Sequence, residues 1–259
     1  MPLVDGLTLH RPESIVLGLI TFACCTAGLL LSHVVSLASV ATYGKLAAKD
    51  RWNWNIGSVR GAAGLALFLM AIAAYVDPQL YAGHPVWGRS QLSVTALPCI
   101  VAFFTFEMVT FALMTAVYQY KNNALLVHHV FCLWYWGYAI AYTDSFHFLA
   151  TKGLIQEVTA AFSDLTWKMV KCNNTHSRSY FGTQYLLVFL WVFVRIADDA
   201  HRVWFVYTNW AVLAAEGPGV AFWGTVVTTV LLALLLNPHW LHMKVKQLQR
   251  QLRKVQKTQ

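Results

Sequence analysis

The sequence has very few charged side chains. Charged residues make up 12% of its 259 residues, whereas hydrophobic residues make up 58%. This composition excludes an ordinary soluble domain, in which about a quarter of the residues are charged. Lys and Arg outnumber Asp and Glu by 19 to 11, but they lie in short segments between apolar runs. Membrane topology distributes basic residues in this way, and no basic groove with interleaved aromatics is present. We therefore expect no nucleic-acid partner.

Motifs for disulfides and metals are also scarce. The chain has five cysteines, and none of them forms a CxxC pair, so neither a disulfide framework nor a zinc site is indicated. Membrane-bound lipid oxidases use several HxxxH and HxxHH clusters, whereas this chain offers one HxxH, from His239 to His242. We predict no metal ligand set.

Seven apolar runs account for most of the chain. They cover about residues 15–43, 61–76, 93–118, 124–142, 146–169, 180–207 and 220–236. About 17 to 25 apolar residues cross a bilayer. With the N-terminus in the lumen, most Lys and Arg fall on the cytosolic side, and the opposite segments hold only Arg11 and Arg89. This bias predicts an all-α integral membrane bundle of about seven transmembrane helices, with a lumenal N-terminus and a cytosolic C-terminus.

The runs also suggest a division of the chain. We assign residues 1–43 to an N-terminal segment with the first transmembrane helix, 44–245 to the helical bundle and 246–259 to a basic cytosolic tail. The tail is compatible with an amphipathic helix on an anionic surface and equally with a solvated basic end.

The most informative stretch contains two adjacent histidines and two carboxyl groups. His128 and His129 lie near the start of the fourth run, and Glu157 and Asp164 lie in the fifth. Seven residues make two helical turns within about 20°, so the carboxyl groups share one face, roughly 10 Å apart. Ionisable groups in membrane helices are costly and usually face a bundle interior. A single such histidine is more often structural, but this combination favours a functional site.

A second polar group lies in the sixth run and consists of Arg195, Asp198, Asp199, His201 and Arg202. The spacing of four residues predicts the ion pairs Arg195–Asp199 and Asp198–Arg202. Two interpretations stay open. The pairs neutralise each other near the interface, or an arginine binds an anionic headgroup or phosphate, with His201 and one aspartate facing the same cavity. Glu107, alone in the third run, is a candidate partner for one of these arginines.

Several stretches together resemble a known family. They are FFTFEMV, LLVHHVF, GLIQEVTAAF, HRVWFVYTNW and LLLNPHWLHMKVKQL. In order and spacing the chain resembles the TLC-domain family (TRAM, Lag and the ceroid-lipofuscinosis protein) over about residues 50 to 245, and its ceroid-lipofuscinosis branch most closely. The resemblance implies a multi-pass protein of the endoplasmic reticulum membrane, with cycling to the ER–Golgi intermediate compartment left open.

Ceramide synthases of the same family use a His-His pair with downstream acids. By this resemblance His128 and His129 fall on the pair, and Glu157 and Asp164 fall on the acids. The synthases' Arg before the pair is Val127 here, and their His-Asp dipeptide is Gln156-Glu157. The full synthase motif is therefore absent, and a related acyl transfer to a different lipid is left open.

The resemblance implies a lipid acyltransferase that needs no cofactor. It would move a fatty acyl chain from acyl-CoA or an acyl-phospholipid to a lysolipid, glycerophospholipid or sphingoid acceptor. One histidine of the pair would act as base or transient acyl carrier, and Glu157 or Asp164 would orient it. The remaining polar residues would bind substrate: Glu107, Arg195, Asp198, Asp199, His201 and Arg202.

Two other classes of function compete with this interpretation. A non-enzymatic, lipid-binding adaptor for ER-to-Golgi transport of lysosomal proteins would need a lumenal surface, and residues 78–92 offer few anchors. A seven-helix signalling receptor fits the helix number but lacks a receptor-type motif. Membrane lipids and an acyl donor are the expected partners, while a homodimer and lysosomal-enzyme cargo stay open.

Overall fold

The computed structural model describes residues 12–80, 84–140 and 144–256, and within these ranges the regular structure is entirely helical. Four rods of helix come first: α1 (Pro12–Ser39), α2 (Ala48–Tyr75), α3 (Gln91–Tyr118), and α4 (Asn123–Cys132) continued by η4 (Leu133–Ile140). Three more follow: α6 (His147–Ile155) with α7 (Val158–Lys171), α8 (Arg178–Leu190) with η5 (Trp191–Ile196) and α9 (Ala197–Thr208), and α11 (Gly219–Leu231) with η6 (Leu232–Leu236) and α12 (Asn237–Gln256). The short helices η2 (Tyr43–Lys45), η3 (Pro78–Leu80) and α10 (Trp210–Glu216) lie between rods.

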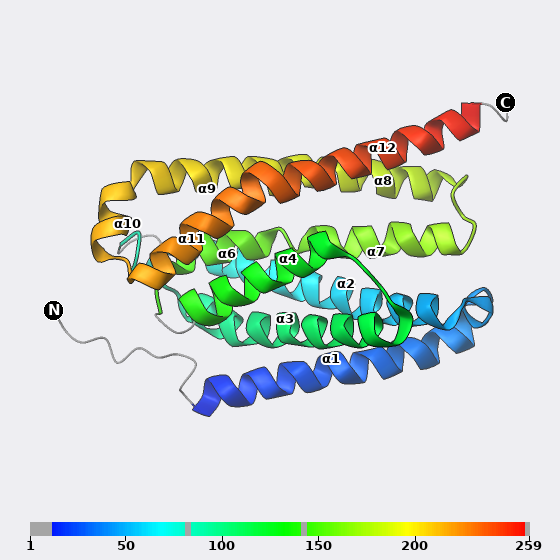
Figure 1. Ribbon diagram of the computed structural model, residues 1–259, viewed down its shortest axis with the longest axis horizontal. Helices are drawn as coiled ribbons and strands as arrows, with labels where there is room; N and C mark the ends of the chain where they lie inside the picture. The colour runs from blue at the N-terminus through cyan, green and yellow to red at the C-terminus, as the bar shows by residue number, and fades with distance from the viewer. Residues whose placement is uncertain (1–11, 81–83, 141–143, 257–259) are drawn as a thin grey trace.

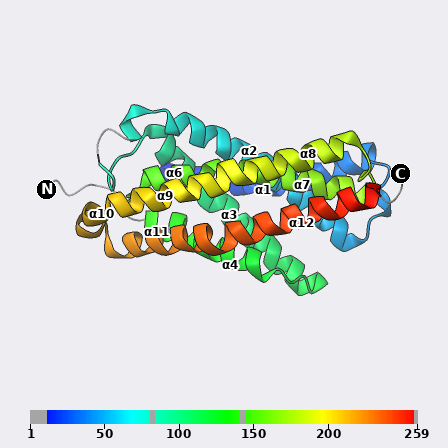
Figure 2. The same cartoon turned by 90° about the horizontal axis from the view of Figure 1, so that it is seen from above.

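The rods run along one long axis of the molecule (Figure 1). The α1 helix lies on one side and packs against α2 and α3, and α8 with α9 lies on the other side. The rod of α11 and α12 runs obliquely to its neighbours (Figure 1). Seen from above, α1 begins at one end of the bundle and α12 ends at the other (Figure 2). The two ends lie apart because an odd number of rods follows the long axis.

Five of the described helical segments are long and apolar enough to cross a membrane by themselves. They are Pro12–Ser39, Ala48–Tyr75, Gln91–Tyr118, Arg178–Thr208 and Gly219–Arg253. The outward side chains are apolar as well: Leu19, Leu30 and Leu31 of α1 are each more than 60% exposed. Lipid tails, not water, suit such a surface. The protein is an integral membrane helical bundle, as the composition predicted.

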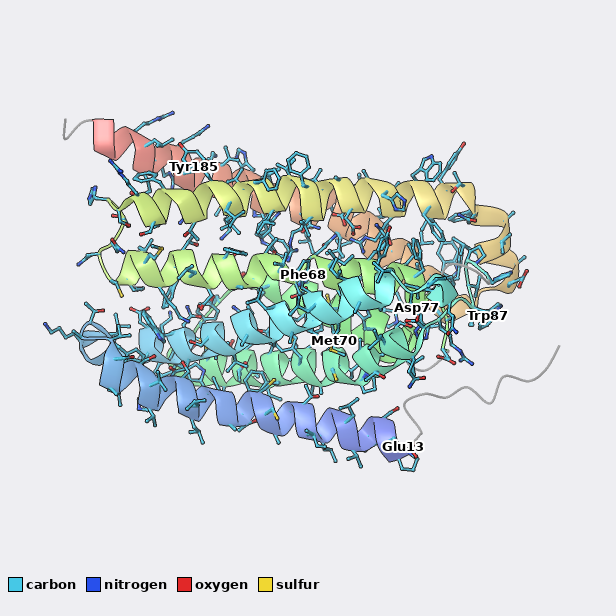
Figure 3. The ribbon with its side chains drawn as sticks, turned by 180° about the vertical axis from the view of Figure 1, so that it is seen from behind. Glu13, Phe68, Met70, Asp77, Trp87 and Tyr185 are labelled. Carbon is cyan, nitrogen blue, oxygen red and sulfur yellow. The ribbon has the colours of Figure 1, made fainter. Side chains whose placement is uncertain are left out.

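Polar groups gather at the end of the bundle where α1 begins. Glu13, Asp77 and Trp87 all lie at this end, while Tyr185 projects from the outer face of α8 (Figure 3). Asp144 forms ion pairs there with Arg89 and with His147, whose Nε2 lies 2.9 Å from the carboxylate. This pairing ties the segment before α6 to the segment before α3.

A seam of glycines brings α2 and α7 close together. Gly57, Gly61 and Gly64 follow the small-residue spacing that lets membrane helices approach closely. A Cβ atom added to Gly64 would lie 2.6 Å from the Glu157 carbonyl oxygen, which leaves no room for a side chain. The seam therefore fixes α7 against the middle of α2.

The structure corrects the predicted spans in two places. The second helix begins at Ala48, not near residue 61, so Arg60 lies inside α2 and not in the segment before it. The last helix does not stop at Asn237-Pro238 but continues to Gln256. The π-helical η6 ends at Leu236, and its wide turn lets the chain pass a proline without ending the helix.

Candidate active site

A chamber of about 200 Å³ lies inside the bundle between α2, α3, α4, α7, η5 and α12. We call it the chamber, and its walls are formed by Arg60, Phe104, Glu107, Leu125, His128, His129, Glu157, Thr159, Ala160, Ser163, Trp191, Arg195, Trp240 and Lys244. Both histidines and one of the two predicted carboxyl groups therefore face a common space.

His129 is held firmly from both sides of its ring. The side chain of Asn122 accepts a hydrogen bond from the Leu125 amide and starts α4. One turn later, His129 Nδ1 lies 2.9 Å from the Leu125 carbonyl oxygen, and Nε2 lies 2.6 Å from Glu107 Oε2. A carbonyl and a carboxylate are both hydrogen-bond acceptors, so each ring nitrogen of His129 already lies against a partner. Neither nitrogen is left for a substrate.

Glu107 lies between Arg60 and His129 in a row of polar side chains. Its second oxygen accepts a hydrogen bond from Arg60 Nε at 2.5 Å. We predicted that Glu107 could pair with Arg195 or Arg202, but its partners are Arg60 and His129. The structure gives the reason: α2 starts early enough to carry Arg60 to the level of Glu107 on α3.

His128 has a different environment from its neighbour. The side chain is 8% exposed, and its ring contacts the rings of Phe104, His129 and Trp240 at centroid distances of 6.2, 5.4 and 5.3 Å. Its polar contact is with Cys132, whose Sγ lies 3.6 Å from Nδ1 and 3.7 Å from Nε2. Within the described residues no carboxylate or carbonyl group bonds to this ring. A thiol is a weak hydrogen-bonding partner, so the ring nitrogens of His128 are only weakly engaged beside the chamber.

Glu157 is the second unengaged group. The helix breaks between α6 and α7, and Glu157 is the residue just before α7. Its side chain lines the chamber while the residue is 6% exposed. In the part of the chain that the structure describes, this carboxyl group has no hydrogen bond and no ion pair. A carboxyl group kept buried without a partner is costly, which marks it as a candidate functional group.

Arg195 supplies a fixed cation to the chamber wall. It donates to Thr159 Oγ1 at 2.8 Å and to Asn237 Oδ1 at 3.0 Å, and its guanidinium lies 4.7 Å from the Trp191 ring centroid. The predicted ion pair with Asp199 does not form. Arg195 lies inside the π-helical segment η5, one residue before its end, and the wide turn of this segment changes the angle between residues four apart.

Asp198, Asp199 and Arg202 belong to a separate network behind the chamber. Arg202 pairs with Asp199 and, at 3.3 Å, with Asp198, as the spacing predicted for the latter pair. Lys152 also pairs with Asp198 at 2.7 Å, and Asn237 donates to Asp199 at 2.6 Å. We call this group the aspartate network, and its members are Lys152, Gln156, Asp198, Asp199, Arg202 and Asn237. Both aspartates turn inward, although we expected only one to do so, because cations and amides from three helices converge on them.

The structure leaves two predicted residues outside the chamber. His201 is exposed, with its ring near those of Phe148 and Trp204. Asp164 lies two turns beyond Glu157, as the spacing requires, but there it pairs with Lys168 and fills the space beside Gly57. A position on one helical face does not place both carboxyl groups in one cavity.

The two departures from the synthase motif have clear structural counterparts. Val127 points outward and is 40% exposed. Gln156 belongs to the aspartate network, because its amide donates to Asp199 at 2.8 Å. Glu157, the next residue, is the one that reaches the chamber. Sequence reasoning missed Arg60, Phe104, Trp240 and Lys244, which also line the chamber.

In the described residues no three His, Cys, Asp or Glu side chains are grouped as metal ligands. The chamber instead contains cations and aromatic rings around His128 and Glu157. Such an arrangement suits proton transfer and nucleophilic chemistry at a carbonyl group.

Comparison with known proteins places this site in a family. The TLC-domain profile matches residues 52–246, a range that contains the whole chamber wall. The chain belongs to the TLC-domain family. It is 27% identical over 223 residues to Protein CLN8 of Rattus norvegicus and 28% identical over 222 residues to Protein CLN8 of Mus musculus. The human Protein CLN8 is 24% identical, and each alignment covers 85% of this chain and 76% of the relative. No solved structure matches the chain.

Proposed function

We propose that this TLC-domain protein is a lipid acyltransferase in which His128 is the reacting group. One observation carries the proposal: His128 is buried in the chamber with only the weakly bonding Cys132 thiol as a polar partner, while both ring nitrogens of the adjacent His129 have strong acceptors. Imidazole serves near neutral pH both as a base and as a nucleophile. The sequence left open which histidine of the pair reacts, and the hydrogen bonds favour His128.

The chemistry follows from the groups around the chamber. A nitrogen of His128 attacks the carbonyl carbon of a thioester or ester, the bond to the leaving group breaks, Glu157 gives its proton to the departing thiolate or alkoxide, and the acyl chain stays on the imidazole. The hydroxyl or amine of the acceptor then attacks the same carbon, the imidazole leaves, and the acceptor's proton passes to Glu157. If His128 is a general base instead, it takes that proton directly, and no acyl-enzyme forms.

Fixed cations support the transition state in either route. Negative charge develops on the carbonyl oxygen, and pre-oriented donors stabilise it most when they are held in a site that excludes water. Arg195 is held by Thr159 and Asn237 on the chamber wall. The row of Arg60, Glu107 and His129 fixes the backbone and ring beside His128, so it is a positioning device.

The size of the chamber bears on the substrate. A space of about 200 Å³ is smaller than the pockets that enclose drug-sized ligands, which are roughly 300 to 1,000 Å³. It suits the reacting ends of donor and acceptor, with the acyl chain lying between helices or in the bilayer. We propose acyl-CoA or an acyl-phospholipid as donor, a lipid acceptor, and the endoplasmic reticulum membrane as the location.

An acyl-transfer assay on the purified protein tests this function. Labelled acyl-CoA and acyl-phospholipids are offered in nanodiscs with a panel of lysolipids, glycerophosphodiesters and sphingoid bases. We expect a labelled lipid product that His128→Ala abolishes while the variant keeps its elution profile and melting temperature. An acyl adduct on the peptide that contains His128 would identify the carrier route. Absence of product from every donor–acceptor pair, with lysosomal-enzyme binding by the same preparation, would contradict the proposal and favour an adaptor.

A further inference from the structure

A second cavity adjoins the chamber and is strongly basic. It has a volume of about 780 Å³ and lies between α12 and the start of α4. We call it the vestibule. Trp240 and Lys244 line both the vestibule and the chamber, so the two spaces share a wall. Lys244, Lys246, Arg250 and Arg253 line the vestibule, and its eleven lining residues include no Asp or Glu.

The positions of these cations form a pattern. Lys246, Arg250 and Arg253 are four and three residues apart, which places them in one stripe along α12. The stripe is about 10 Å long at a rise of 1.5 Å per residue. The N-terminal end of α4, at Asn122 and Ala124, faces the same space, and its free backbone amides add positive potential. The vestibule thus presents several positively charged hydrogen-bond donors to one space.

The vestibule cations differ from the basic groups of the bundle that have carboxylate partners. Arg60, Arg202, Lys152 and Lys168 are each paired with a carboxylate. Within the described ranges, none of the four vestibule cations has an ion-pair partner, and Lys244 instead lies 5.8 Å from the Trp191 ring centroid. Four unpaired cations around one cavity favour an anionic ligand.

We propose that the vestibule binds the phosphate groups of the acyl-transfer substrate and so aims its ester or thioester at His128. This inference rests on the proposed function, and the shared wall carries it: Trp240 contacts the His128 ring at 5.3 Å, and Lys244 stands beside it. Arg195 and Arg202, which the sequence suggested as phosphate ligands, are already engaged by side chains of the bundle. Arg250 and Arg253 lie beyond the matched range 52–246, so this part of the site is not defined by the family profile.

Two phosphate-bearing substrates fit this chemistry, the nucleotide part of acyl-CoA and the phosphodiester of a glycerophospholipid. The test measures equilibrium binding to the full chain in a non-ionic detergent, which avoids the phosphates of a bilayer. The probes are coenzyme A against pantetheine, which lacks the nucleotide phosphates, and lysophosphatidylglycerol against monoacylglycerol. Binding is compared among the wild type, Arg250→Gln/Arg253→Gln and His128→Ala.

A matched control separates a site from a general charge effect. Lys45→Gln/Arg178→Gln removes two exposed basic residues elsewhere on the chain. We expect at least one phosphate probe to bind well above its phosphate-free counterpart, and to bind about tenfold more weakly to Arg250→Gln/Arg253→Gln. The control pair should change binding less than twofold, and His128→Ala should leave it intact.

The outcomes distinguish this inference from the function on which it rests. Phosphate-dependent binding that requires Arg250 and Arg253 supports the vestibule site even in a preparation without acyl transfer, in which case the proposed chemistry alone fails. Equal binding of probes with and without phosphate, or equal weakening by the control pair, overturns the vestibule site even if transfer is observed. Binding of coenzyme A would identify acyl-CoA as the substrate held in the vestibule, and binding of lysophosphatidylglycerol would identify a glycerophospholipid.

Discussion

The chamber and the aspartate network are both buried polar clusters, and they are neighbours. Gln156 and Asn237 stand between them, because Arg195 contacts both and both contact Asp199. In the network, each charged side chain has an opposite charge or an amide as its partner. In the chamber, the row of Arg60, Glu107 and His129 is equally complete, but His128 and Glu157 are left over.

Whether a buried charged group has a partner therefore distinguishes structural residues from candidate catalytic residues better than the charge itself does. Burying an ionisable group in a bundle is costly unless hydrogen bonds and opposite charges offset the loss of water. The aspartate network meets that condition, so its charges are explained by packing. His128 and Glu157 do not meet it, and an unexplained buried group beside a cavity is a functional candidate.

The largest effect on stability should come from breaking the aspartate network. Arg202→Met removes a fully buried guanidinium and leaves two inward-facing aspartates with fewer partners. Loss of one partner of a buried ion pair costs about 3–5 kcal/mol, so we expect a clear fall in melting temperature in detergent. His201→Ala, one residue away and exposed, is the control and should change stability by less than about 0.5 kcal/mol. An Arg202→Met protein as stable as the wild type would contradict the structural role of the network.

A substitution of Glu157 should lower activity and leave stability unchanged. Glu157→Gln keeps the shape of the side chain but removes its ability to take a proton, so acyl transfer should slow about 10²-fold, while the melting temperature stays within the range of the wild type. A profile of rate against pH should also lose the limb that reports this carboxyl group. Unchanged transfer, or a loss of folding as large as that of Arg202→Met, would place Glu157 with the structural charges.

His129 should lie between these extremes. As a positioning residue it acts through its neighbour, so His129→Gln should reduce the turnover rate about tenfold, with a smaller effect on KM. The variant also leaves Glu107 with Arg60 as its one strong partner, so a moderate fall in melting temperature should accompany the loss of activity. If His129→Gln abolishes an acyl adduct that His128→Ala leaves in place, the assignment of the two histidines must be exchanged.

The sequence predicted much of this comparison, and particular residues show where prediction stopped. Apolar runs and the bias of Lys and Arg indicated the helices, and the His-His pair with Glu157 indicated the site. Which histidine is free could not be predicted, because it depends on Glu107 and Leu125, which reach His129 only through tertiary packing.

Contacts predicted from residue spacing were also wrong where the helices are irregular. The predicted pairing of Arg195 with Asp199 assumed 3.6 residues per turn, but the π-helical segment η5 lies directly before α9. Arg60 precedes the second apolar run, which covers about residues 61–76, although the helix itself starts at Ala48. Hydrophobicity marks the part of a helix that meets lipid, and the polar turns that precede it are not visible in that signal.

Asp164 offers the smallest and sharpest test of the comparison. It resembles Glu157 in sequence, seven residues away on the same face, but it has a partner in Lys168, which also donates to Ser58 Oγ at 2.6 Å. Asp164→Asn keeps a hydrogen-bond acceptor beside Lys168 and should lower stability by about 1 kcal/mol or less, since this pair is not fully buried. Acyl transfer by Asp164→Asn should stay within about twofold of the wild type. A loss as large as that of Glu157→Gln would show that both carboxyl groups serve the reaction, and that a paired charge is no evidence against a catalytic role.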